Sequence, residues 1–334
     1  YSYKFSKNLS NTISLVFDKK TFKLDAGFRH QLINLGTDRE LPAAVGVVIP
    51  TENKENRLGA VGNLEIKLWD KVDVKSFLEY SNGKSFGNYL RSENLLKLEP
   101  IKGYILDAHV NFQSAIPSFN YLMNPSFYQN FNYNFGGAKN QSITEIGGKV
   151  NLKWFESSVF ANYFRIDNFA YFGTDFLPKQ SSETVNISQI GGEATLNYWK
   201  LKFNTKLLFQ SALSQKELLP MPNFVGRLNV FYQSKAFKNA AEIQTGFKVY
   251  YFSKFKSRDY FPVLNEFVLS NSGTSIGGQP IADAYFNMKV KRMMIFAEAQ
   301  HFNTTFMKNK SFTAPNYPIY DFRLNLGIVW YIFH

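Results

Sequence analysis

Asp321-Phe-Arg-Leu-Asn-Leu-Gly-Ile-Val-Trp-Tyr-Ile332 is the stretch of sequence that decides the fold. Its even-numbered positions are all apolar, whereas most of its odd-numbered positions are polar or glycine. Because successive side chains of a β-strand point to opposite faces, this alternation predicts a strand with one wholly apolar face. The same alternation recurs over residues 21–34, 103–113, 144–154 and 241–251. The chain is therefore predicted to be all-β.

The connections between the predicted strands fall into two classes. Tight turns occur near residues 19–20, 70–71, 156–157, 200, 237–238 and 291–292, and long polar loops cover residues 35–57, 115–141, 168–185, 213–223, 254–280 and 306–319. Regular alternation of the two is typical of outer-membrane barrels, whose short turns are periplasmic and whose long loops are extracellular. The sequence therefore predicts a single domain over residues 1–334, an antiparallel transmembrane β-barrel of about 16 strands (14–18).

The strand count has consequences for the chain ends. The sixteen predicted strands include two at the start, over residues 1–5 and 9–18, and two at the end, over residues 294–305 and 320–333. An even number of strands places both termini on the periplasmic side. The segment 1–5 is too short to pair fully with the last strand, and no signal peptide precedes it. We therefore expect that the chain is truncated at its N-terminus.

The composition fits a membrane barrel better than a helical membrane protein. Phe occurs 34 times and Tyr 19 times, and both residues favour strands. No apolar run reaches the length of a spanning helix. The mean hydropathy of −0.25 agrees with strands that alternate between lipid and water. The chain has no cysteine, as in many envelope proteins.

The charged residues are dispersed, although the net charge is +12. Nucleic-acid binding normally needs basic residues gathered in a stripe or tail, so we expect no nucleic-acid partner. The charges that fall on the polar parity of the strands predict a water-filled lumen with a modest preference for anions. Alternatively, neighbouring charges of opposite sign only pair across strands. The predicted pore-lining residues are Lys23, Arg29, Lys67, Lys149, Lys206, Arg227, Lys248, Arg323, Glu145, Glu193 and Glu242.

All four tryptophans lie near tight turns or the C-terminus, where one membrane interface is expected. By parity, Trp154 and Trp330 face lipid and are the predicted interface aromatics, although simple strand aromatics would give the same pattern. The C-terminal residues also resemble the terminal-strand signal that outer-membrane assembly machinery reads. The residues of this signal are Asn325, Gly327, Trp330, Ile332 and Phe333.

A longer C-terminal stretch resembles a known family. It runs from Ala284-Tyr-Phe-Asn-Met-Lys-Val-Lys-Arg-Met-Met-Ile-Phe-Ala-Glu-Ala299 to Ala314-Pro-Asn-Tyr-Pro-Ile-Tyr320. A basic tight turn before a strand, an Asn-containing loop and a Pro-bracketed approach to the last strand are similar to the putative porin family of Bacteroidota. The resemblance covers about the last fifty residues well and implies an outer-membrane barrel without catalytic residues.

The sequence offers little support for catalysis. The four histidines are scattered without metal-ligand spacing, and His109 lacks the serine that an acyl-transfer site beside Asp107 would need. We therefore expect no enzyme activity, no catalytic or metal site and no cofactor. The aromatic loop 118–134 has two readings, an inward constriction or sugar-stacking platform and a loop tucked against the rim.

These observations favour an outer-membrane porin of a Gram-negative bacterium that lets small hydrophilic solutes diffuse passively. A structural or anchoring barrel in an envelope complex, and the barrel portion of a receptor-type transporter, remain as alternatives. The expected partners are outer-membrane lipid, small hydrophilic solutes and the barrel-assembly machinery.

Overall fold

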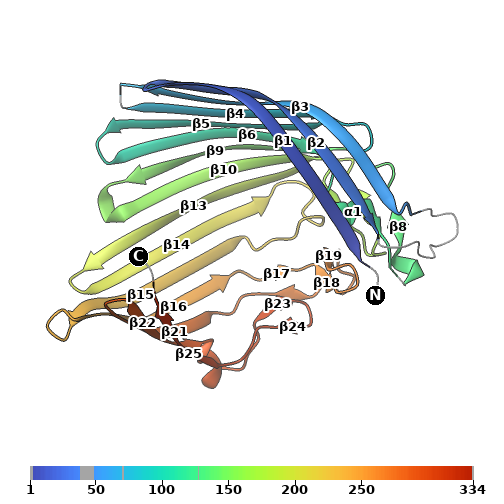
Figure 1. Ribbon diagram of the computed structural model, residues 1–334. Helices are drawn as coiled ribbons and strands as arrows, with labels where there is room; N and C mark the ends of the chain where they lie inside the picture. Colours follow the sequence, from blue (N-terminus) through green and yellow to red (C-terminus); the bar gives the residue numbers. More distant parts are fainter. Residues whose placement is uncertain (1–2, 38–48, 70, 127, 333–334) are drawn as a thin grey trace.

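The computed structural model describes residues 3–37, 49–69, 71–126 and 128–332. One antiparallel sheet of 15 strands forms the main body, and each strand pairs with the next along the chain. Figure 1 shows that this sheet is strongly curved. Its strands are β1 (Lys4–Lys19), β2 (Phe22–Thr37), β3 (Glu52–Leu68), β4 (Val72–Asn82), β5 (Tyr89–Ile101), β6 (Tyr104–Ala115), β9 (Gln141–Leu152), β10 (Ser157–Asp167), β13 (Val185–Tyr198), β14 (Leu201–Ala212), β15 (Phe224–Ala236), β16 (Ala241–Phe252), β21 (Ile281–Val290), β22 (Met293–Gln300) and β25 (Arg323–Trp330).

The register of the sheet gives each strand one face toward the concave inside and one toward the outside. Directly paired residues share a face, so a single row can be followed from strand to strand. One such row reads Lys67, Asp73, Lys97, Asp107 and Lys149 from β3 to β9. The concave side of the sheet is therefore the polar face that the alternation predicts.

Short turns and long loops lie at opposite ends of the sheet (Figure 1). Several short turns place non-glycine residues at positive φ, for example Trp199 at 57° and Lys291 at 51°. Two-residue hairpins require positive φ because only that twist matches the right-handed twist of the strands. Trp199 and Lys200 form such a hairpin between the paired residues Tyr198 and Leu201.

The first part of the chain differs from the prediction. We expected two strands, over residues 1–5 and 9–18, but residues 4–5 and 9–18 belong to one strand, β1, which pairs with β2 along its whole length, and residues 1–2 lie outside the described residues. Ser6, Lys7 and Asn8 are polar and interrupt the apolar alternation, but their backbones still pair with residues 33–35 of β2. The described sheet consequently has 15 strands, a number within the predicted range, and the predicted count of 16 is not reached.

The odd number of strands also changes where the chain ends lie. β1 begins at the long-loop end of the sheet, whereas β25 ends at the short-turn end (Figure 1). The expectation that both termini lie on one side is therefore wrong for the described sheet. β1 and β25 form the two edges of the sheet, and no pairing between them occurs among the described residues.

Two strand boundaries were also predicted incorrectly. The strand expected over residues 294–305 ends at Gln300, because His301 adopts a left-handed conformation and a short helix, η3 (Phe302–Thr305), follows. β3 begins at Glu52, inside the segment that we expected to be a loop. The middle of that loop, residues 38–48, lies outside the described residues.

The long loops fold into small elements of their own. They contain α1 (Phe119–Leu122), η1 (Gln129–Phe131), β7 (Met123–Asn124), β8 (Tyr133–Asn134), β11 (Ala170–Phe172), β12 (Pro178–Gln180), β17 (Phe255–Lys256), β18 (Asp259–Phe261), β19 (Glu266–Val268), β20 (Ser275–Ile276), β23 (Phe312–Ala314) and β24 (Tyr317–Pro318), and η2 (Trp154–Glu156) lies in a short turn. A four-stranded sheet of order β12-β11-β19-β18 joins two loops that lie far apart in the sequence. We call the described residues of loops 83–88, 116–140, 168–184, 213–223 and 253–280 the cap.

The cap contains one buried apolar core of its own and shares a second with the sheet. Tyr133, Phe172, Leu264 and Val268 form the first core, and Phe172 is fully buried. In the second core, Phe169, Leu219 and Met221 of the cap pack against Ile166, Val185 and Ile187 of β10 and β13. These three strand residues belong to the inner face, because Val185 pairs with Ile166 and Ile187 with Phe164 in the register of inner-face rows. The cap therefore folds inward against the concave wall.

Candidate pore wall

All eleven predicted pore-lining residues lie on the concave face. The cross-strand register brings Lys23 next to Glu65 and Asp18, and Lys206 between Glu193 and Arg227. The same register places the other members of the set on this face: Arg29, Lys67, Glu145, Lys149, Glu242, Lys248 and Arg323.

The inner face of β1 to β6 carries balanced charge. Its rows alternate in sign, as in the row from Lys67 to Lys149, so cations meet anions on the neighbouring strand. Lys23 lies 3.4 Å from Asp18, and both side chains are about half exposed. Eight cations face eight anions: Lys4, Lys23, Arg29, Arg57, Lys67, Lys75, Arg91 and Lys97 against Asp18, Asp25, Glu55, Glu65, Asp73, Glu79, Glu93 and Asp107.

The inner face of β9 to β25 has an excess of cations. Lys206 lies 2.5 Å from Glu193, and Lys248 lies 3.8 Å from Glu298 and 4.7 Å from the ring centre of Tyr285. Eight cations face five anions: Lys149, Lys202, Lys206, Arg227, Lys235, Lys248, Lys289 and Arg323 against Glu145, Glu193, Glu242, Asp283 and Glu298. The net positive charge of the described inner wall therefore lies on these strands.

A buried ion pair, which the sequence analysis did not single out, fixes the loop between β4 and β5. Arg57 Nε lies 3.6 Å from Glu55 Oε2, and both side chains are less than a tenth exposed. The same carboxylate accepts the backbone N–H of Phe86 at 2.8 Å, and the guanidinium donates to the carbonyls of Phe86 and Gly87. The three hydrogen bonds to Phe86 and Gly87 hold residues 83–88 against the inner face of β3. Both charges lie in a segment that we had assigned to a loop, so their pairing had no signal in the strand alternation.

Other polar contacts on the wall also satisfy charged groups locally. Arg29 is ion-paired with the buried Glu79 at 2.5 Å. His109 Nε2 lies 3.3 Å from Glu145 Oε1, and Asn111 donates to the other oxygen of the same carboxylate at 3.0 Å. His109 therefore belongs to a polar wall cluster with an acid and an amide.

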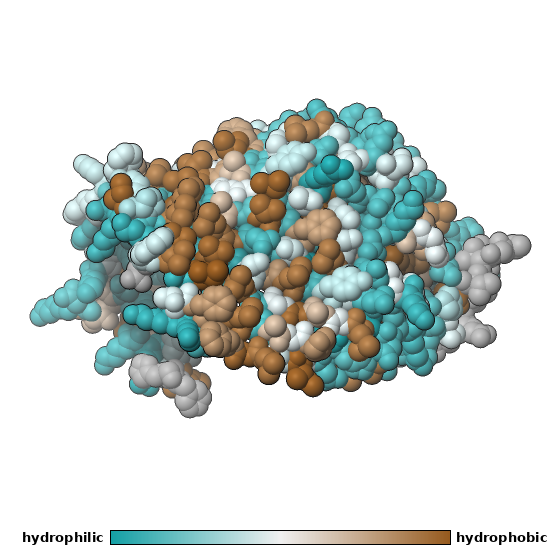
Figure 2. Space-filling view, turned by 90° about the horizontal axis from the view of Figure 1, so that it is seen from above, coloured by the Kyte–Doolittle hydropathy of each residue, from teal (hydrophilic) through white to brown (hydrophobic). Residues whose placement is uncertain are grey.

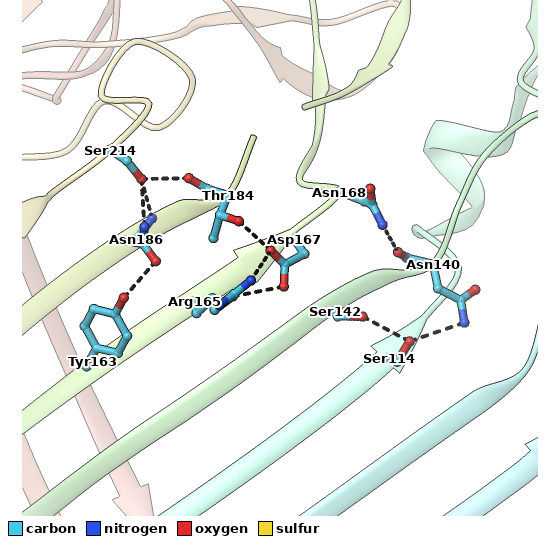
Figure 3. Close-up of polar contacts among 10 residues, drawn as sticks. All are labelled: Ser114, Asn140, Ser142, Tyr163, Arg165, Asp167, Asn168, Thr184, Asn186 and Ser214. Atoms are coloured by element: carbon cyan, nitrogen blue, oxygen red, sulfur yellow. Dashed lines mark hydrogen bonds and ion pairs between the residues drawn. The ribbon is translucent and has the colours of Figure 1, made fainter. Parts of the chain in front are cut away.

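At the long-loop end, polar side chains tie neighbouring strands to one another (Figure 3). Asp167 accepts hydrogen bonds from Thr184 at 2.6 Å and from Arg165 at 3.2 Å. Further bonds in the same belt join Asn168 to the Asn140 carbonyl, Ser142 to Ser114, and Tyr163 to Asn186. The belt connects β6, β9, β10 and β13 at the height where the cap begins.

The outward face is apolar. Seen from above, apolar side chains gather toward the short-turn half of the sheet, and hydrophilic residues predominate at the long-loop end (Figure 2). Large apolar residues on this face are widely exposed, for example Ile13 at 82% and Phe28 at 81%. An apolar area of this extent is not stable in water and requires an apolar cover.

The predicted interface and assembly residues lie at the short-turn end. Trp330 is the last residue of β25 and is 71% exposed on the outward face, and Trp154 is 65% exposed in the turn after β9. Asn325 and Gly327 are on the inner face of β25, where the Phe296 ring lies over Gly327 and leaves no space for a Cβ atom. Ile332 follows the strand and is exposed, and Phe333 lies outside the described residues.

Neither a membrane-spanning helix nor a metal-binding cluster occurs among the described residues. No helix in this part of the chain is both long and apolar enough to cross a membrane. No group of three or more His, Cys, Asp or Glu side chains in the same ranges is arranged to hold a metal ion.

The curved antiparallel sheet, polar inside and apolar outside, defines a protein of the outer-membrane β-barrel class. Comparison with protein families then identifies the family. The profile of the putative porin family matches residues 2–334, and the chain belongs to that family. The resemblance noted in the last fifty residues is therefore confirmed, and its restriction to Bacteroidota stays a prediction. No curated protein matches the chain.

Solved structures of similar fold are outer-membrane receptors. The ferric enterobactin receptor PfeA of Pseudomonas aeruginosa is 13% identical with a TM-score of 0.71, and the match covers 98% of this chain and 54% of that one. The siderophore receptor PirA of Acinetobacter baumannii is 10% identical with a TM-score of 0.67 over 98% and 55% of the two chains. The FrpB iron transporter of Neisseria meningitidis is 13% identical with a TM-score of 0.65 over 98% and 56%. The chain thus spans about half the length of these proteins, and the likeness concerns the fold.

Proposed function

We propose that the protein is an outer-membrane channel through which small hydrophilic solutes diffuse passively, with a preference for anions. The observation that carries this proposal is the register of the sheet, which gathers charged residues on the concave face and apolar ones on the other. A wall of this kind encloses water and faces lipid. Membership of the putative porin family supports the same function, and nothing in the family or the fold points to an enzyme.

The proposal includes closure of the sheet into a barrel. Edge strands carry unpaired backbone N–H and C=O groups, and hydrocarbon offers these groups no partner. Both edge strands of the described sheet have such groups, and the similar receptor structures support closure. β1 and β25 run in the same direction, so antiparallel closure requires an odd number of further strands between them. Folded barrels resist SDS and migrate differently before and after boiling, so a gel with and without heating tests closure.

Conductance in planar bilayers tests the channel itself. We expect reproducible open-channel steps, together with a reversal potential across a salt gradient that has the sign of anion preference. The cation excess on β9 to β25 is the reason for this sign. A cation-selective current would overturn the anion preference, and silence in the bilayer would favour the structural or anchoring barrel.

A receptor-type transporter is the second candidate, because the solved structures of similar fold are siderophore and iron transporters. The folded cap supports this candidate. It has its own buried core and lies at the long-loop end of the sheet, where a large ligand would first meet the protein. A receptor would conduct little in the bilayer and would bind a large ligand tightly. Titration with iron siderophores therefore separates it from a diffusion channel.

The proposed location is the outer membrane of a Gram-negative bacterium. Family and fold support this location. Outer-membrane lipid would then cover the outward apolar face, with Trp154 and Trp330 at one interface. Barrel-assembly machinery would read the residues of β25. Fractionation of the envelope by density tests the location.

A further inference from the structure

We propose that the inner wall of β13 to β16 contains a subsite for small organic anions with an apolar body, such as aromatic carboxylates. The inference rests on the proposed channel function and names the substrate class that the wall selects. Its basis is that two adjacent rows of the inner face, one cationic and one apolar, line a single hollow of about 550 Å³.

The cationic row holds two positive groups beside one carboxylate, and Lys149, which is in register with Phe160, reaches the same carboxylate. Glu193, Lys206 and Arg227 lie side by side on β13, β14 and β15. Lys206 Nζ is 2.5 Å from one oxygen of Glu193, and Lys149 Nζ reaches the other oxygen at 3.8 Å. Asp107 of β6 is the direct neighbour of Lys149, and among the described residues Glu193 is the one anion beside Lys206 and Arg227. One positive charge of the group therefore remains, and it attracts an anion from the lumen.

Arg227 keeps hydrogen-bonding capacity that the protein does not use. One of its terminal nitrogens donates to Asn204 Oδ1. Its Nε atom is enclosed and has no hydrogen-bond partner among the described residues. A guanidinium carries five N–H donors in a plane that matches a carboxylate or phosphate. The enclosed Nε is closed to a solute, so an anionic oxygen would bond the terminal N–H groups that the contact with Asn204 does not use.

The apolar row lies directly beside the cations, one step toward the cap. Phe160, Leu208, Val225 and Phe252 are in register on this row, with Gly191 between the first two. A Cβ atom at Gly191 would lie 2.6 Å from the Phe160 ring, so the ring covers the glycine and closes the strip. A solute that is hydrophilic all over does not require such a strip. A ligand with one anionic group and an apolar body contacts both rows at once.

The inner face of β3 to β6 supplies an internal comparison. There Lys67 belongs to a row whose charges alternate in sign, with Asp73 as its direct neighbour. Lys67→Gln changes the net charge of the wall by the same amount as Lys206→Gln. Lys67 lies on β3, and the strands β4, β5, β6 and β9 separate it from Phe160 of the subsite, so it provides the matched control variant.

Binding and conduction are measured separately, with benzoate and its neutral isostere benzamide as probes. Calorimetry on the detergent-purified protein should show benzoate binding about tenfold more tightly than benzamide, a difference that a charge-assisted hydrogen bond accounts for. Arg227→Gln should weaken benzoate binding by about tenfold, and Lys206→Gln by only about threefold because this lysine is half exposed. Glu193→Gln should strengthen binding by about threefold, and Lys67→Gln should leave it unchanged.

The opposite signs of these effects distinguish the subsite from general structural damage. Equal binding of benzoate and benzamide would overturn the subsite, as would equal losses in Arg227→Gln and Lys67→Gln. If Arg227→Gln does not fold, the nearly isosteric Glu193→Gln carries the test, and a weakened affinity in that variant overturns the subsite. Benzoate binding without any bilayer current would overturn the channel and leave the subsite. Bilayer current without discrimination between benzoate and benzamide would overturn the subsite and leave the channel.

Discussion

The two halves of the inner wall carry similar numbers of cations but use them differently. On β1 to β6 every inner-face cation except Lys4 has an anion on its own or a neighbouring strand, and several pairs are buried or hydrogen-bonded to backbone. On β9 to β25 three cations share Glu193, and the cations exceed the anions. Paired charges stabilise local structure, whereas unpaired charges set the potential of the lumen. Net charge alone therefore does not locate function on a barrel wall.

The largest expected effect concerns the buried pair on the balanced half. Arg57→Ala removes the partner of Glu55 and the two bonds to the carbonyls of loop 83–88. Breaking a buried ion pair by removing one partner costs roughly 3–5 kcal/mol, because the other charge stays buried and unpaired. Denaturant titration in lipid vesicles should show a loss of this size. A loss below about 1 kcal/mol would contradict the structural role of the pair.

The matched control is an exposed pair on the same half. Arg91 lies 2.5 Å from Glu93, and both side chains are more than two fifths exposed. Arg91→Ala should change the unfolding free energy by no more than about 0.5 kcal/mol, since exposed ion pairs contribute little.

The second prediction addresses the cationic half. On β9 to β25 the cations exceed the anions by three. This excess is matched by three lysines of the same strands, Lys202, Lys206 and Lys248. Their joint replacement by Gln should bring the permeability ratio of anions to cations close to about 1, because the inner wall then carries no net charge from the described strands. The reversal potential across a potassium chloride gradient measures this ratio.

Replacing both members of a balanced pair is the control for selectivity. Glu65→Gln together with Lys75→Gln removes one charge of each sign from adjacent strands. The reversal potential should stay at the wild-type value. If this double variant shifted it as far as the triple variant does, the difference between the two halves would have no functional meaning.

The sequence predicted the faces of the wall well and its loops poorly. Alternation depends only on neighbouring residues, so it placed all eleven pore-lining candidates on one face and β25 nearly in full. A polar stretch can form a strand when a partner strand pairs with its backbone, and alternation carries no sign of that partner. For this reason the sequence predicts a gap between two strands at Ser6 to Asn8, where β1 is continuous.

The parts that sequence reasoning missed all depend on contacts between distant loops. The Glu55–Arg57 pair closes on a loop about thirty residues away. The aromatic residues of loop 118–134 pack with Phe172 and Phe261, which lie in two other loops. These contacts bury the aromatic side chains inside the cap, and both interpretations of that loop, an inward constriction and a loop tucked against the rim, stay predictions. No local period encodes such contacts, because each requires the fold to bring the loops together.

The third prediction concerns the cap, which joins the two halves. Lys4 at the start of β1 donates to Asn120 at 2.7 Å, and Asn120 donates to Glu266 of β19 at 2.6 Å. The Tyr133 hydroxyl donates to the Asn120 carbonyl. Burial raises the pKa of Tyr133 above its ordinary value of 10.0, and the nearby Glu266 raises it further.

The sign of the pH dependence follows from this raised pKa. A group with a raised pKa contributes stability that is fully present below its unfolded pKa and is lost as the pH rises through the folded one. The cap should therefore resist proteolysis at pH 9 and lose protection only above about pH 10. Tyr133→Phe should remove the part of this dependence that ionisation of Tyr133 causes. Unchanged loss in that variant would assign the alkaline transition to other groups.

The smallest expected effect is the coupling between Asp18 and Lys23. Both side chains are about half exposed, and the 3.4 Å pair lies on the edge hairpin of β1 and β2. Water screens such a pair, so a double-mutant cycle with Asp18→Asn and Lys23→Gln should give a coupling energy of at most about 0.5 kcal/mol. The reversal potential of the double variant should equal that of the wild type, because the two changes cancel in charge. A coupling energy as large as that of the buried Glu55–Arg57 pair would mean that exposed ion pairs on β1 to β6 also stabilise the fold. The strength of an ion pair on this half would then depend on its position in the wall more than on its burial.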